Sequence, residues 1–173
     1  MKTARRPLNV WRVLTPRWFA KGIVVMLASV MLAAASPATA APLAGLNYLV
    51  GTWNCTYRAG TVRFAYDDTY AYERNGHTLR QIASWAGGSD EEFLVYDAKR
   101  AGWTAVVLDD QGTATIMRGT GSDPNHIAYR SVYPDASIAE TFDHVSATEY
   151  TIHATVRSGG KTITSVDTCL RKP

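Results

Sequence analysis

Hydrophobic and polar residues alternate along most of the chain after residue 50, in short runs rich in β-branched and aromatic side chains. Alternation with a period of two is typical of strands with one buried face, and the helical period of 3.6 is nearly absent. The pattern therefore predicts an all-β domain, preceded by a short helix or turn at residues 43–50. The predicted strands, about ten in number, are 52–58, 61–73, 78–86, 92–97, 103–109, 113–120, 126–133, 137–143, 148–157 and 161–171.

Two turn signals predict the pairing of the first three strands. A two-residue loop at Ala59-Gly60 would place Cys55 opposite Phe64, and a type I′ turn at Asn75-Gly76 would pair residues across the next hairpin. Because side chains alternate along a strand, both turns predict one aromatic face and one polar face. The expected inner face contains Trp53, Tyr57, Val62, Phe64, Tyr66, Tyr70, Tyr72, Leu79 and Trp85. The expected outer face contains Thr52, Asn54, Thr56, Arg58, Arg63, Asp67, Glu73 and Arg80.

The first forty residues have the pattern of an export signal rather than of a folded segment. A region with six basic and no acidic residues is followed by the apolar run 22–35 and by small residues at 38–40. This order predicts a signal peptide over residues 1–40 that is cleaved after export, and a single domain over 41–173. The expected location is the bacterial periplasm or the medium. Retention of the leader as an N-terminal anchor is the alternative.

The leader also dominates the charge of the chain. The whole sequence has 18 Lys and Arg against 15 Asp and Glu, and the six basic residues of the leader leave 12 against 15, a net charge of −3. The expected mature domain therefore lacks the basic surface that binds nucleic acid. No stable membrane insertion is expected once the leader is removed.

Cys55 and Cys169 are the only cysteines, and an exported protein meets an oxidising compartment. A bridge between them would join the first strand to the last, as closure of a sheet into a barrel requires. We therefore predict an antiparallel up-and-down barrel of about eight to ten strands with a Cys55–Cys169 disulfide. The same pairing would place Trp53 opposite Arg171, where the guanidinium can cover the indole.

The chain combines Gly51, Trp53 and Arg171 with a pattern of tyrosine-aspartate, tryptophan and glycine residues over 93–121. In these features it resembles the calycin superfamily of lipocalins, fatty-acid-binding proteins and bacterial relatives. The segment 93–121 looks like lipocalin-like bacterial families of unknown function. The resemblance implies a closed barrel that carries a small ligand. No C-terminal helix is expected before Pro173, which favours a helix-free relative over a true lipocalin.

No catalytic motif is found in the sequence. Both cysteines are assigned to a bridge, no nucleophile elbow is present, and the histidines lack the spacing of a metal site. Asp109-Asp110 is interpreted as a hairpin turn, and Asp90-Glu91-Glu92 as a solvated loop. We therefore expect no enzyme activity, no metal and no cofactor.

The aromatic inner face is the main indication of function. Packing in the core is expected for Trp53, Phe64 and Trp85, whereas tyrosine hydroxyls need partners and favour a pocket. Asp68 could anchor a ligand or could mark the end of the buried part of a bent strand. The candidate ligand-binding residues are Tyr66, Asp68, Tyr70, Gln81, Trp85 and Tyr129.

Three functions compete at this stage. The first is an exported barrel that binds a small, largely apolar molecule, as a monomer or weak dimer. The second is a protein-interaction module similar to periplasmic protease inhibitors, in which the N-terminal segment 41–50 or a loop inserts into a partner protein. The third is a haem barrel resembling the nitrobindins, with His153 as the iron ligand.

Overall fold

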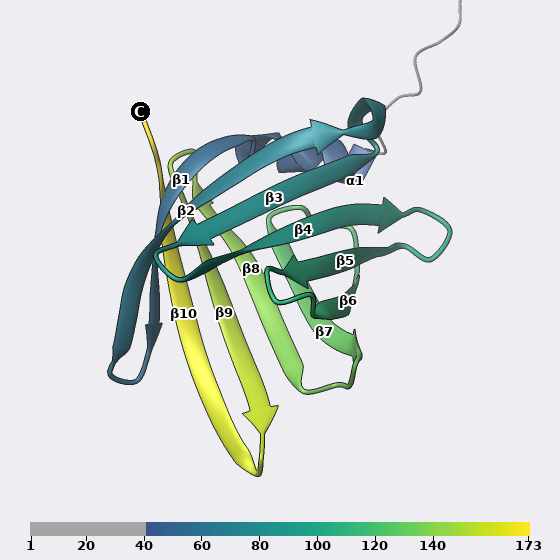
Figure 1. The fold of residues 1–173 in the computed structure, drawn as a ribbon. Coiled ribbons are helices and arrows are strands. Elements are labelled where there is room, and N and C mark those ends of the chain that lie inside the picture. The colour runs from purple at the N-terminus through teal and green to yellow at the C-terminus, as the bar shows by residue number, and fades with distance from the viewer. Residues whose placement is uncertain (1–40) are drawn as a thin grey trace, which may run out of the picture. The chain divides into compact units, whose positions relative to one another are not determined.

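The computed structural model describes residues 41–173, which form a closed antiparallel barrel of ten strands (Figure 1). Each strand pairs with the next along the chain, and the first pairs with the last. The elements are α1 (Ala41–Ala44), the 3-10 helix η1 (Gly45–Tyr48), β1 (Gly51–Ala59), β2 (Val62–Glu73), the 3-10 helix η2 (Arg74–Gly76), β3 (Thr78–Trp85), β4 (Gly88–Asp97), β5 (Gly102–Asp109), β6 (Ala114–Thr120), β7 (His126–Tyr133), β8 (Ile138–Ser146), β9 (Glu149–Ser158) and β10 (Lys161–Arg171).

The seam of the barrel, where β1 pairs with β10, has the predicted pairing. Cys55 lies opposite Cys169 and is joined to it by a disulfide, and Trp53 lies opposite Arg171. The Arg171 guanidinium carbon is 4.4 Å from the centre of the Trp53 ring. The all-β closed barrel and its disulfide are therefore confirmed.

The register of the first hairpin differs from the prediction by two residues. Cys55 lies opposite Tyr66 rather than Phe64, because the loop consists of Gly60 and Thr61 instead of Ala59 and Gly60. Only glycine adopts the left-handed backbone of the first loop position without strain, and Gly60 has φ of 57° there. A shift of two residues keeps every side chain on its predicted face.

The second hairpin has the predicted pairing, with Tyr70 opposite Gln81. Its turn is longer than two residues, since the last paired residues are Glu73 and Thr78. Asn75 has φ of 58°, as the turn signal indicated.

The N-terminal segment closes one end of the barrel. Leu43, Leu46 and Leu49 are at most 1% exposed and belong to the hydrophobic core. The Trp53 indole donates a hydrogen bond of 2.7 Å to the Leu49 carbonyl. These residues are therefore part of the core and are not a free arm, which corrects the hypothesis that 41–50 insert into a partner protein.

Gly51 is required at the junction between this segment and β1. Its φ is +125°, and a Cβ at this position would lie 2.8 Å from Nη1 of Arg171. Arg171 donates hydrogen bonds to the carbonyls of Val50 and Tyr48, so it ties β10 to the segment that covers the barrel end. The Gly-x-Trp motif and the arginine thus form one structural unit.

The predicted signal peptide, residues 1–40, lies outside the described residues. Within residues 41–173 the structure contains no helix that is long and apolar enough to cross a membrane.

Candidate functional site

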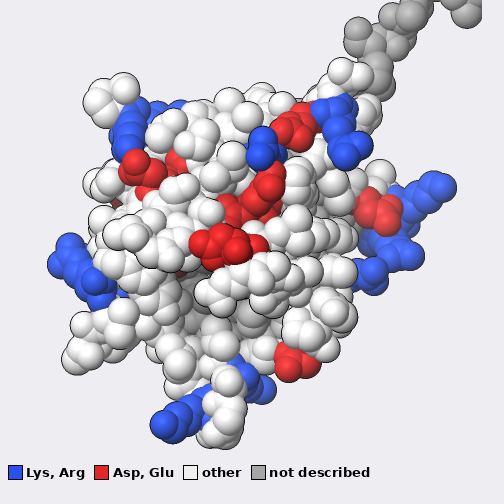
Figure 2. Space-filling view, viewed as in Figure 1, with Lys and Arg blue, Asp and Glu red and all other residues white. Residues whose placement is uncertain are grey.

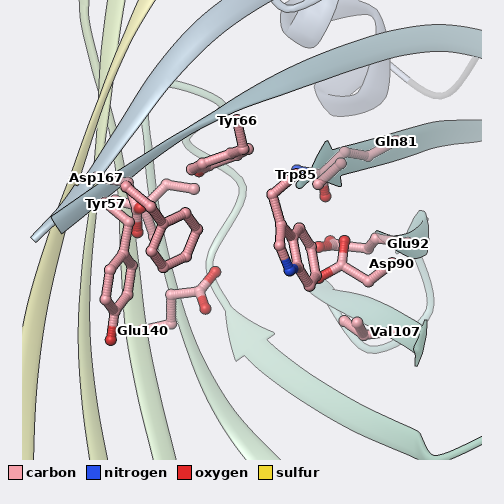
Figure 3. Close-up of a pocket in the computed structure, with 12 residues that line it drawn as sticks. Tyr57, Tyr66, Gln81, Trp85, Asp90, Glu92, Val107, Glu140 and Asp167 are labelled. Atoms are coloured by element: carbon pink, nitrogen blue, oxygen red, sulfur yellow. The ribbon is translucent and has the colours of Figure 1, made fainter. Parts of the chain in front are cut away.

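A cavity of about 270 Å³ occupies the half of the barrel remote from α1 and η1 (Figure 3). Aromatic rings, aliphatic side chains and carboxylates line it together. The lining residues are Tyr57, Phe64, Tyr66, Gln81, Ala83, Trp85, Asp90, Glu92, Val107, Glu140, Ile152 and Asp167.

Three of the predicted ligand-binding residues, Tyr66, Gln81 and Trp85, line this cavity. Tyr70 is 5% exposed, and its hydroxyl lies 3.4 Å from that of Tyr150. Tyr70 therefore belongs to the packed core and not to the cavity wall. Tyr129 is also buried, and it is not part of the cavity wall. The ligand-binding role of these residues remains a prediction.

Phe64 and Trp85, which were expected to pack in the core, line the cavity and are 39% and 36% exposed. The Phe64 ring stacks on Tyr57 with centroids 4.8 Å apart, and the Trp85 ring lies 6.3 Å from Phe64. Both residues lie toward the uncovered end of the barrel, which no helix of residues 41–173 closes. Trp53, in contrast, is fully buried as predicted.

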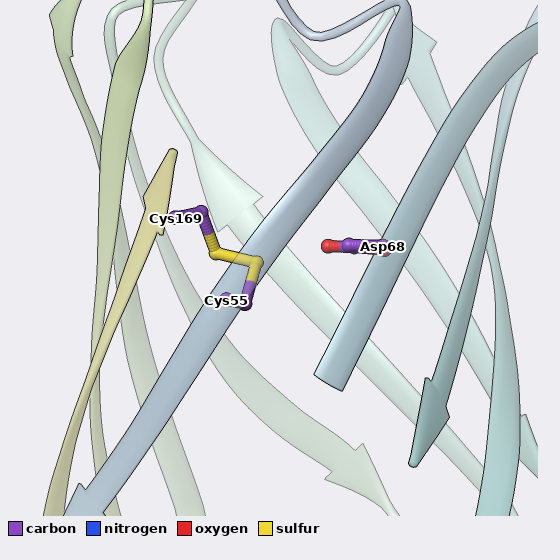
Figure 4. A group of neighbouring side chains, drawn as sticks. All are labelled: Cys55, Asp68 and Cys169. Carbon is purple, nitrogen blue, oxygen red and sulfur yellow. A yellow bond between two sulfur atoms is a disulfide. The ribbon is translucent and has the colours of Figure 1, made fainter. Parts of the chain in front are cut away.

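Asp68 lies in a polar layer between the cavity and the covered end of the barrel. Its Oδ2 accepts hydrogen bonds of 2.6 Å from Tyr150 and 2.7 Å from Gln81. It is fully buried beside the disulfide (Figure 4), and it does not line the cavity. Asp68 thus neither faces the ligand space nor ends the buried part of β2.

Cys55, Asp68 and Cys169 are the single group of three potential metal-binding residues within 41–173 whose ligand atoms lie within 4.8 Å of one another. The two sulfur atoms are bonded to each other in the disulfide and carry no thiolate charge, so this group lacks the donor set of a zinc site.

The acidic character of the cavity was missed by sequence analysis. Asp90 and Glu92 were expected in a solvated loop, but β4 begins at Gly88 and both side chains line the cavity. The sequence did contain a signal for this position. Asp90 and Glu92 precede the apolar Leu94 at intervals of two residues, and residues two apart share a face of a strand. Glu140 and Asp167 come from β8 and β10, and only closure of the barrel places them opposite β4. The expectation of a largely apolar pocket is therefore corrected.

The cavity carboxylates hold protons more tightly than exposed acids do. Removal from bulk water raises the pKa of Glu140 to about 7, and that of Asp90 and Asp167 to about 6 each. Burial also raises the pKa of Glu92, with the Glu140 charge adding to the effect. The ionised form of each group lacks full hydration, so negative charge is unfavourable in the cavity.

Replacement of Glu140 by glutamine should stabilise the protein at pH 8. The pKa of Glu140 is about 7 in the folded state against 4.5 ordinarily, so the folded state binds this proton more tightly. The free energy of unfolding therefore falls as the pH rises from about 4.5 through about 7. Glu140→Gln should add about 1–3 kcal/mol at pH 8 and little at pH 4.5, as measured by thermal unfolding.

The matched control is Glu149→Gln, which removes a carboxylate from the outer face of β9. It should show no comparable pH-dependent gain. An equal stabilisation at both pH values, or a loss at pH 8, would contradict the assignment of Glu140 as a half-buried, destabilising charge.

His153 lies on the outer face of the barrel and is exposed. The alternation along β9 places its neighbours Tyr150 and Ile152 inside instead. The hypothesis that His153 holds haem inside the barrel is therefore wrong, because its imidazole faces away from the interior.

Comparisons with known proteins support the fold alone. No protein-family model matches the chain, and no similar curated protein is found. Among solved structures, the S-type phycobiliprotein lyase CPES from Guillardia theta is similar, with a TM-score of 0.50 and 13% identity over 74% of this chain and 90% of the lyase. The ten-stranded antiparallel barrel fits the calycin-like fold that Gly51, Trp53 and Arg171 indicated.

The same finding corrects the expectation that the protein is not an enzyme. The similar barrel is a lyase, so the absence of a familiar catalytic motif is no ground for excluding catalysis in this fold. Fold similarity at this identity does not transfer the reaction.

Proposed function

We propose that the protein is an exported, calycin-like barrel that binds a small organic molecule in the uncovered half of its interior. The observation that carries the proposal is the division of the barrel into a packed half and a hollow half. Trp53, Trp103 and Tyr150 fill the covered half and are at most 1% exposed. The cavity in the other half approaches the lower end of the size range of small-molecule sites, about 300 Å³.

Aromatic and aliphatic walls with a few polar groups are typical of such sites. The export pattern of residues 1–40 supports a role outside the cytoplasm. The similar phycobiliprotein lyase supports the barrel fold on which the proposal rests.

Introduction of a large side chain at Ala83 should abolish binding. Ala83 lines the cavity and is 5% exposed, so a phenylalanine ring at this position would occupy the ligand space. We expect native mass spectrometry of protein purified from its own host to show a bound compound, and Ala83→Phe to lose it. The matched control is Ala71→Phe, on the outer face of β2, which should retain the compound.

Thermal unfolding of both variants would show that the barrel is intact. Repeated recovery of wild-type protein without any bound compound, or retention of the compound by Ala83→Phe, would overturn the proposal.

A further inference from the structure

The cavity is surrounded by negative charge from three strands. Figure 3 shows Asp90 and Glu92 of β4 on one side of the space, and Glu140 of β8 and Asp167 of β10 on the other. None of the described residues that line the cavity is a lysine, an arginine or a histidine. On the exterior, Figure 2 shows a group of acidic side chains near the middle of the viewed face, and both acidic and basic side chains toward its edge.

Within residues 41–173 no positively charged side chain pairs with these carboxylates, and Asp167 accepts a hydrogen bond from the Tyr66 hydroxyl. Asp167 is 8% exposed, and its Oδ1 has no hydrogen-bond partner within residues 41–173. The five ion pairs found in the described chain involve none of the four cavity acids. A buried polar atom without a partner is costly, and a buried charge more so, unless a ligand supplies the missing interaction.

The aromatic side chains add a second feature that favours cations. Tyr57, Phe64, Tyr66 and Trp85 line the same space as the carboxylates. The negative faces of such rings attract ammonium groups that lie within about 6 Å of the ring centre. A combination of aromatic rings and carboxylates is suited to a positively charged group that is part of an organic molecule.

A bare metal ion fits the cavity poorly. Within the described chain, no three of its carboxylates bring oxygen atoms within 4.8 Å of one another. A calcium ion takes six to eight oxygen ligands at about 2.3–2.6 Å. The aliphatic walls at Ala83, Val107 and Ile152 also offer apolar contacts, which a hydrated ion does not use.

We propose that the ligand of this cavity is a small organic cation, a protonated amine or quaternary ammonium with an apolar body. This proposal rests on the proposed function, because it names the chemical class that the same site binds. The carboxylates neutralise the positive head, the aromatic rings contact it, and the aliphatic wall packs against the body.

Calorimetric titration of the protein with three compounds of similar shape tests the assignment. Benzyltrimethylammonium carries the charge, neopentylbenzene replaces its nitrogen with carbon, and phenylacetate carries the opposite charge. At pH 8 the cation should bind at least tenfold more tightly than either of the others, and its affinity should fall with rising salt. Glu140→Gln and Asp167→Asn should each weaken the cation about fivefold or more and leave the neutral compound unchanged, whereas Glu149→Gln should change neither.

Binding of the neutral compound or the anion as tightly as the cation, lost in Ala83→Phe, would overturn the ligand class and leave the proposed function intact. The ligand class would also be overturned if Glu140→Gln and Asp167→Asn bound the cation as tightly as the wild type does. Failure of all three compounds to bind would overturn the ligand class, and absence of any compound in protein from the host would remove the proposed function as well.

Discussion

Replacement of Cys55 and Cys169 together by alanine is expected to lower the free energy of unfolding by about 2–5 kcal/mol. The disulfide joins residues 114 positions apart and connects β1 to β10 at the seam of the barrel. Without the bridge the denatured chain gains the freedom of a long open loop, whereas the folded chain still pairs the two strands. Urea unfolding monitored by tryptophan fluorescence would measure the loss.

The wild-type protein in reducing agent is the control for this experiment, because it lacks the bridge but keeps both sulfur atoms. Both cysteines are fully buried, so alanine also removes packing volume. If most of the loss comes from the bridge, the reduced wild type should lose nearly as much stability as the variant. A loss below about 1 kcal/mol in both proteins would contradict the view that the bridge restrains the seam.

Replacement of Trp53 by alanine is expected to cost about 3–5 kcal/mol of unfolding free energy. The Trp53 indole is fully buried and lies edge-on to Tyr150, with ring centroids 4.8 Å apart. It also holds the covering segment through the Leu49 carbonyl and lies under Arg171. Alanine would leave a cavity where β1, β10 and the covering segment meet, and urea unfolding would measure the resulting loss.

A double-mutant cycle with Trp53→Leu and Arg171→Met isolates the contact between the indole and the guanidinium. Leucine stays apolar but removes the aromatic face, while methionine keeps the length of the arginine stem and loses its charge. We expect a coupling of about 0.5–2 kcal/mol between the two sites. A coupling near zero would mean that the contact between Trp53 and Arg171 does not stabilise the fold. A loss below about 1.5 kcal/mol for Trp53→Ala would mean that the covered end is not the main core.

Local sequence rules predicted the strands and faces of this barrel well, because alternation and turn chemistry act over a few residues. The strand at 126–133 was predicted with its observed bounds. The seam was predictable for a different reason: a bridge between the two cysteines supplies one long-range constraint, and strand geometry extends it to Trp53 and Arg171. The first hairpin missed its register by two residues, since the sequence did not show which loop position needed a left-handed backbone.

The sequence by itself determined an exported-type leader pattern, an all-β domain, one covalent seam and an aromatic inner face. Only the tertiary structure showed that residues 43–49 fill one end of the barrel, and that acidic residues of β4, β8 and β10 share the space at the other. The physical reason is that alternation tells which side of its own strand a residue occupies. The depth of that residue, and the partners that face it across the interior, depend on how ten strands stagger and close.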